Sequence, residues 1–134
     1  MQEKTYQATV ENLPAATDYI SEGLLAAGAG EAVIMQITLA FEEIFVNIAK
    51  YAYPKGSGIV TVAINSEDKT FTLITKDNGL RFDPLQKDDP DYNYIADENT
   101  MGGLGIFMVK KIMDTVSYEY KDGQNILTMT KKIS

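Results

Sequence analysis

Runs in which apolar and polar residues alternate occur five times along the chain, and alternation of this period predicts β-strands. The first run places Tyr6, Ala8 and Val10 on one side of its strand. The last two runs flank Asp122-Gly123, a pair that favours a tight hairpin turn. The predicted strands span residues 3–11, 59–65, 70–76, 116–120 and 126–131.

Three other segments repeat their apolar residues every three or four positions, the spacing of an amphipathic helix. The first begins near Asn12 and Pro14 and ends at Gly28, residues that favour a helix start and a helix stop. The second covers residues 31–53 and the third covers 104–114. The predicted buried stripe of the second helix consists of Ile34, Ile37, Phe41, Ile44 and Ile48.

Residues 81–101 show no period and are rich in Asp and Glu. A structureless loop of about twenty residues is uncommon in a compact domain and is typically a lid or a binding loop. The 134 residues contain no repeat or linker, which favours a single domain over residues 1–134. We expect an α+β fold, a two-layer α/β sandwich whose mixed, mostly antiparallel sheet is covered on one face by about three helices.

The composition excludes several classes of function. A formal net charge of −7 disfavours nucleic-acid binding, which requires clustered Lys and Arg, and Arg81 is the only arginine. No apolar run approaches the roughly 18 residues of a membrane span, and the first residues, 1–6, lack the apolar stretch typical of a signal peptide. We therefore expect a cytoplasmic protein that binds neither nucleic acid nor membrane.

The chain contains neither Cys nor His. Disulfides, thiolate metal sites and imidazole acid-base chemistry are therefore excluded. Asp, Glu and Lys must carry any acid-base or metal chemistry, and oxygen ligands suit a hard ion such as Mg²⁺.

The second helix carries a polar group beside its apolar stripe. At about 100° per residue, Glu43, Asn47 and Lys50 fall within roughly a 60° sector. An amide oxygen can bind Mg²⁺, and a carboxylate one turn away can act as a base. Glu42 points about 100° away and serves as an internal control. A solvated polar pair is the alternative interpretation.

Asp77-Asn78-Gly79 follows the strand 70–76 directly. A carboxylate accepts a hydrogen bond from the exocyclic amine of adenine, which guanine lacks at that position. Gly79 allows the backbone to approach a base closely. A plain turn is the alternative interpretation.

A glycine-rich run, Gly102-Gly103-Leu104-Gly105, precedes the third helix. Amide groups at a helix N-terminus can hold phosphate oxygens. A flexible loop end is the alternative interpretation. Gly28-Ala29-Gly30 follows a helix and lacks the third glycine of a dinucleotide site, and neither a P-loop nor EF-hand spacing is present.

Taken together and in this order, the three motifs give the chain its family resemblance. It resembles the stand-alone anti-sigma-factor serine/threonine kinases of the GHKL ATPase superfamily over nearly its whole length. The run Asn-Gly-x-x-Phe-Asp-Pro over 78–84 is also similar to that subfamily. The Glu43-x-x-x-Asn47 spacing resembles the N box, Asp77-Asn78-Gly79 the G1 box, and 102–109 the second glycine box.

The resemblance implies a role for each motif. It implies ATP as the nucleotide, with Asn47 on Mg²⁺, Asp77 on adenine, the glycines on phosphate, and residues 81–101 as an ATP lid. Many relatives have a Thr after the glycine of the last hairpin that helps to hold adenine, whereas Gln124 and Asn125 stand here. Asn125 shares strand parity with Leu127 and Met129, so we expect it to face inward.

Three functions fit these residues. The first is a protein-serine/threonine kinase in which Glu43 is the base, Lys50 lies near phosphate and the substrate is an anti-anti-sigma-type protein. The second is a module that grips a sigma factor or another regulator according to its nucleotide, with little turnover. The third is an ATP hydrolase. The residues leave this choice and dimerisation open.

Overall fold

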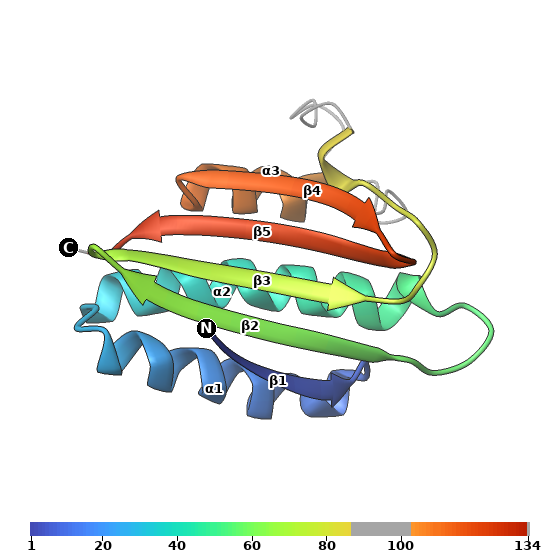
Figure 1. The fold of residues 1–134 in the computed structure, drawn as a ribbon, viewed down its shortest axis with the longest axis horizontal. Helices are drawn as coiled ribbons and strands as arrows, with labels where there is room; N and C mark the ends of the chain where they lie inside the picture. Colours follow the sequence, from blue (N-terminus) through green and yellow to red (C-terminus); the bar gives the residue numbers. More distant parts are fainter. Residues whose placement is uncertain (87–102, 134) are drawn as a thin grey trace.

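The computed structural model describes residues 1–86 and 103–133, which form a five-stranded sheet with three helices on one face (Figure 1). The strand order is β1-β2-β3-β5-β4. Every neighbouring pair among these strands is antiparallel, so the expected two-layer sandwich is confirmed and its sheet is not mixed. The strands are β1 (Gln2–Gln7), β2 (Ile59–Glu67), β3 (Thr70–Asp77), β4 (Thr115–Lys121) and β5 (Gln124–Lys132).

The first strand is shorter than the alternation predicts. β1 ends at Gln7, and a 3-10 turn over Val10–Asn12 follows. The side-chain amide of Asn12 donates to the Gln7 carbonyl at 3.0 Å, which turns the chain away from the sheet. Ala8 is buried as expected, but Val10 is 49% exposed. The prediction for Val10 was therefore wrong, because a local side-chain bond competes with the ladder.

Two tight turns join the hairpins. Asp68 and Lys69 between β2 and β3 both have positive φ angles, as do Asp122 and Gly123 between β4 and β5. Positive φ at both central positions is the geometry whose twist matches that of the flanking strands. The predicted turn at Asp122-Gly123 is confirmed.

The helices pack against the sheet face shown behind the strands in Figure 1. The first helix ends as predicted, because Gly28 has a φ of 89° and its amide donates to the Leu25 carbonyl. The helices are α1 (Leu13–Ala26), α2 (Glu31–Asn47) and α3 (Gly103–Ile112), and shorter turns are η2 (Ile48–Ala52) and η3 (Pro84–Gln86).

The second predicted helix changes type before its end. The regular α-helix stops at Asn47, and η2 continues it as a π-helical turn. A π turn closes hydrogen bonds over five residues, so it holds more residues per turn than an α-helix and is frequent at functional sites. The step of about 100° per residue therefore does not extend to Lys50.

The core lies between the sheet and the helices. Ile37, Phe41 and Ile44 are buried as predicted, whereas Ile34 and Ile48 are only partly buried. Phe45 was missed; it is fully buried and its ring centroid lies 5.6 Å from that of Phe41. The buried face of α2 is wider than a narrow stripe because the helix packs against α1 and α3 and shares one core with residues of the sheet.

One helical segment among the described residues, Glu31–Ala52, is apolar and long enough by composition to cross a membrane, with a mean hydropathy of 1.6. The helix nevertheless supplies fully buried core residues, including Ile37, Ala40 and Phe45. Core helices pass the same composition test, so this one is weak evidence for a membrane span.

Candidate functional site

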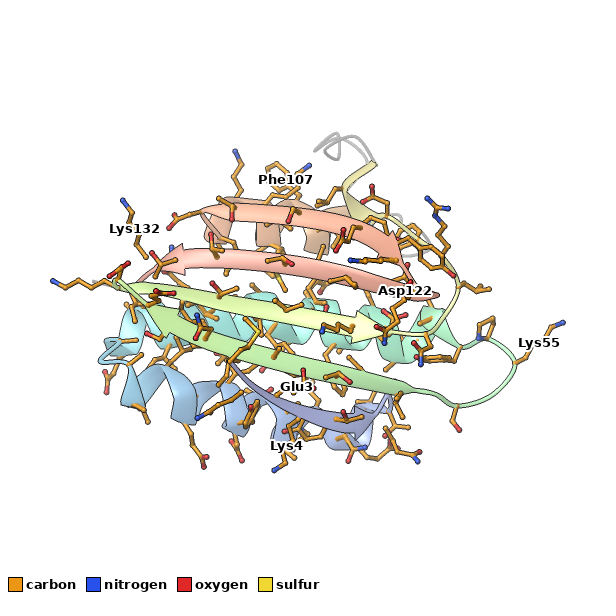
Figure 2. The ribbon with its side chains drawn as sticks, viewed as in Figure 1. Glu3, Lys4, Lys55, Phe107, Asp122 and Lys132 are labelled. Atoms are coloured by element: carbon orange, nitrogen blue, oxygen red, sulfur yellow. The ribbon has the colours of Figure 1, made fainter. Side chains whose placement is uncertain are left out.

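The predicted motifs meet at one end of the sandwich. β3 ends there at Asp77, α2 ends at Asn47 and α3 begins at Gly103. Figure 2 shows Asp122, in the β4–β5 turn, at the same end of the sheet. A cavity of about 170 Å³ opens between these elements. Its walls include Ile44, Asn47, Thr75, Asp77, Ile106 and Leu127.

The carboxylate of Asp77 lies in the cavity wall and is only 6% exposed. Its Oδ1 atom accepts the Gly79 amide at 2.9 Å and the Asn125 side-chain amide at 3.0 Å. Burial raises the pKa of Asp77, and these two hydrogen bonds oppose the rise. Oδ2 accepts no hydrogen bond from the described residues, so it is the acceptor available to a ligand.

Asn125 is buried and faces inward, as its strand parity predicts. It lies directly opposite Asp77 in the β3–β5 register. Besides Asp77, its amide nitrogen donates to the Leu80 carbonyl at 2.9 Å. Its Oδ1 atom accepts the Phe82 backbone amide at 3.1 Å and the Tyr118 hydroxyl at 2.5 Å. Asn125 thus connects β3, β4 and the loop after Gly79.

The π turn holds the loop that follows Asp77. The Leu80 amide donates to the Ala52 carbonyl at 2.9 Å. The Tyr53 hydroxyl accepts the Asn78 amide at 2.8 Å and donates to the Ile59 carbonyl at 2.6 Å. Burial raises the pKa of Tyr53, so its hydroxyl stays protonated for the latter bond. The end of the second helical segment therefore fixes the position of the Asp77-Asn78-Gly79 turn.

We expect Gly79→Ala to destabilise the fold by about 1–3 kcal/mol, the usual effect of overpacking. A Cβ at Gly79 would lie 2.5 Å from both the carbonyl oxygen and the Cβ of Ala52. Backbone held by the Leu80 hydrogen bond cannot move aside easily. Urea unfolding would measure the change. Gly56→Ala is the matched control because nothing lies within 4 Å of its new Cβ, and equal stability of the two variants would contradict the packing argument.

Asn47 presents an amide to the cavity. Its side chain makes no hydrogen bond to another described residue, so its oxygen is available. The described residues include no cluster of three or more acidic side chains that could hold a metal alone. Mg²⁺ is commonly held by one or two protein oxygens together with substrate phosphates and water. Asn47 could supply one such oxygen if a phosphate-bearing ligand occupied the cavity.

Glu43 lies one turn before Asn47, is half-buried, and does not line the cavity. Its carboxylate packs against α3 at Gly105, where an added Cβ would lie 1.9 Å from Glu43 Oε1. Glycine at this position therefore leaves the space that the carboxylate occupies. The atoms nearest to that added Cβ belong to Glu43 and not to Glu42, as the different directions of the two side chains on the helix predict.

The remaining predicted site residues do not line the cavity or lie outside the described residues. Lys50 is exposed and does not line the cavity, because the π turn changes its direction, and its contact with phosphate stays a prediction. Gly103 and Leu104 form the first turn of α3, the predicted phosphate-binding end. Gly102 and most of the predicted lid, 81–101, lie outside the described residues.

Sequence reasoning missed three aromatic or basic residues in the cavity wall, namely Tyr51, Arg81 and Tyr118. The guanidinium of Arg81 stacks 4.9 Å from the ring centroid of Tyr120. Tyr118 could have been found from its strand parity with Val116, a partly buried residue that packs against the core. Arg81 carried no signal beyond being the only arginine, since its stacking partner is distant in sequence.

The family model of the histidine kinase-like ATPase domain matches residues 6–131. The chain belongs to this family, and an ATPase domain of this kind implies ATP binding. It is 32% identical to the serine-protein kinase RsbW of Listeria monocytogenes, over 91% of this chain and 85% of the relative. It is 30% identical to the serine/threonine-protein kinase BtrW of Bordetella bronchiseptica, over 70% of this chain and 67% of the relative.

Solved structures share the fold. The crystal structure of the RsbU and RsbW domains of a Mycobacterium tuberculosis protein aligns with a TM-score of 0.64 at 17% identity. That alignment covers 99% of this chain and 33% of the other. The Acinetobacter baumannii histidine kinase AdeS aligns with a TM-score of 0.54 at 9% identity, over 100% and 70% of the two chains. The predicted GHKL sandwich is therefore confirmed.

Proposed function

We propose that the protein is an ATP- and Mg²⁺-dependent serine/threonine protein kinase. Its substrate in this proposal is an anti-anti-sigma-type protein, through which it regulates a sigma factor in the cytoplasm. The observation that carries the proposal is the buried Asp77 carboxylate, whose Oδ2 atom accepts no hydrogen bond from the described residues, in the wall of a cavity that Asn47 also lines. Relatives named as serine-protein kinases at about 30% identity support the reaction type.

Each residue has a distinct role in this proposal. Asp77 accepts a hydrogen bond from the exocyclic amine of adenine. Asn47 supplies one oxygen to Mg²⁺, which neutralises charge on the phosphates when it is bound. The first turn of α3, beginning at Gly103, receives phosphate oxygens through its free backbone amides. Glu43 removes the proton from a seryl or threonyl hydroxyl.

We expect Asp77→Asn to weaken ATP binding by about 1–3 kcal/mol, the effect of mismatching a buried polar group. The new amide would offer a donor where the adenine amine needs an acceptor, although the volume is unchanged. Calorimetric titration with ATP and GTP would measure both affinities. Wild type should bind ATP and not GTP, and equal affinities for the two nucleotides would contradict the assignment of the adenine site.

The two other functions make different predictions in one experiment. The protein would be incubated with Mg²⁺, ATP labelled in its γ-phosphate, and small sigma-antagonist proteins encoded beside its gene. A kinase transfers the label to serine or threonine of the partner. A nucleotide-dependent binding module retains the partner without labelling it, and a hydrolase releases free phosphate without needing the partner. Absence of labelled partner would contradict the proposed kinase.

A further inference from the structure

The side-chain amide of Asn125 has no hydrogen-bonding capacity left for a ligand. An Asn amide has two N–H donors and one oxygen that accepts two bonds. Both donors are used, one on Asp77 Oδ1 and one on the Leu80 carbonyl. Both acceptor sites of Oδ1 are filled by the Phe82 amide and the Tyr118 hydroxyl.

The partners also fix which way the amide points. A carboxylate and a carbonyl can only accept, so they must face the amide nitrogen of Asn125. The Phe82 backbone N–H can only donate, so it must face the oxygen. Burial raises the pKa of Tyr118, so its hydroxyl remains a donor throughout the neutral range. A flipped amide would lose the bonds to Asp77, the Leu80 carbonyl and the Phe82 amide at once.

In this arrangement one oxygen of Asp77 bonds the protein and the other is available to a ligand. Oδ1 is occupied by Asn125 and by the Gly79 amide, which holds the carboxylate in one orientation. Oδ2 has no partner among the described residues and belongs to a residue that lines the cavity. A buried acceptor held rigidly in place discriminates strongly, because a ligand that lacks the donor leaves it unpaired.

We propose that Asn125 is a positioning residue that orients Asp77 for reading the 6-amino group of adenine, with Tyr118 orienting Asn125 in turn. Asn125 itself touches neither the base nor a water bridging to it. The proposal deepens the proposed function, because it rests on the adenine site at Asp77. In this respect the proposed site differs from that of the many relatives in which a Thr after the hairpin glycine helps to hold adenine.

The test compares ATP with purine riboside triphosphate, which lacks only the 6-amino group, by calorimetric titration. For wild type we expect ATP to bind roughly ten- to a hundredfold more tightly, the effect of one unpaired buried acceptor. In Asn125→Ala this preference should fall below about threefold, because Asp77 Oδ1 then keeps only the Gly79 amide among its described partners and the carboxylate can rotate. In Tyr118→Phe, which removes one hydroxyl and preserves the ring, the preference should be intermediate.

Gln124→Ala is the matched control, since Gln124 is the neighbouring amide on the opposite side of β5, and it should keep the wild-type preference. If Asn125→Ala and Tyr118→Phe weaken both nucleotides equally and keep the preference, the positioning role is overturned. Tyr118→Phe tests the same point should Asn125→Ala fail to fold. Failure of wild type to bind ATP would instead overturn the proposed function itself.

Discussion

Glu43→Gln is expected to bind ATP normally and to lose phosphotransfer by roughly 10²- to 10⁴-fold. Gln keeps the volume and most of the hydrogen bonding of Glu but cannot accept a proton. Glu43 does not line the cavity, so the substitution should leave nucleotide affinity unchanged. Transfer of labelled phosphate to a seryl partner and calorimetric binding of ATP would be measured on the same preparation.

Glu42→Gln is the control for this prediction. The two residues are adjacent, both are half-buried, and they carry the same charge. The three atoms nearest to a Cβ at Gly105, at the start of α3, all belong to Glu43 and none to Glu42. Glu42→Gln should therefore retain both binding and transfer, and near-normal transfer by Glu43→Gln would refute its role as the base.

Gly105→Ala should also lower the rate of phosphotransfer, because it displaces the Glu43 carboxylate and does not remove it. The new Cβ would lie 1.9 Å from Glu43 Oε1 and 2.0 Å from Cδ, so the carboxylate must move away. The displaced atoms are the end of a flexible side chain, so the fold should survive. Misplacing a catalytic group by about 1 Å can lower the rate on the order of 10²-fold. Single-turnover transfer would measure the loss, with a thermal unfolding scan to confirm folding.

A double variant separates the loss of Glu43 from other effects at Gly105. If Gly105→Ala acts only by moving the carboxylate, adding it to Glu43→Gln should cause little further loss of transfer. Weakened ATP binding in the single variant would show that Gly105 contacts the nucleotide instead. If the fold-loss of transfer in the double variant equals the product of the two single losses, the proposed coupling between the two residues is contradicted.

The local patterns in the sequence predicted the elements and the inward direction of Asn125. Strand parity is a property of neighbouring residues, so Leu127 and Met129 were enough to orient it. Its pairing with Asp77 could not be predicted, because the register of β3 against β5 joins residues 48 positions apart. The hydrogen-bond network around Asp77 depends on that register.

Two departures from the predictions have local causes that the patterns did not reveal. The pattern of apolar and polar residues in η2 fits an α-helical turn as well as a π-helical turn. In the π form, the Ala52 carbonyl accepts the Leu80 amide and the Tyr53 hydroxyl accepts the Asn78 amide. The alternation at Ala8 and Val10 favoured a longer strand, whereas the Asn12 side chain ended it. In both places the outcome depends on specific hydrogen bonds and not on hydrophobic period.

In the proposed kinase, the ATP that the protein consumes phosphorylates a partner. The most direct measurement is the balance between ADP formed and phosphoserine or phosphothreonine formed on the partner, determined in one reaction with wild type, Mg²⁺ and ATP. The kinase predicts equal amounts of ADP and phosphorylated residue, with little free phosphate and none of the reaction supported by GTP. ADP formed together with an equal amount of free phosphate, and an unmodified partner, would contradict it.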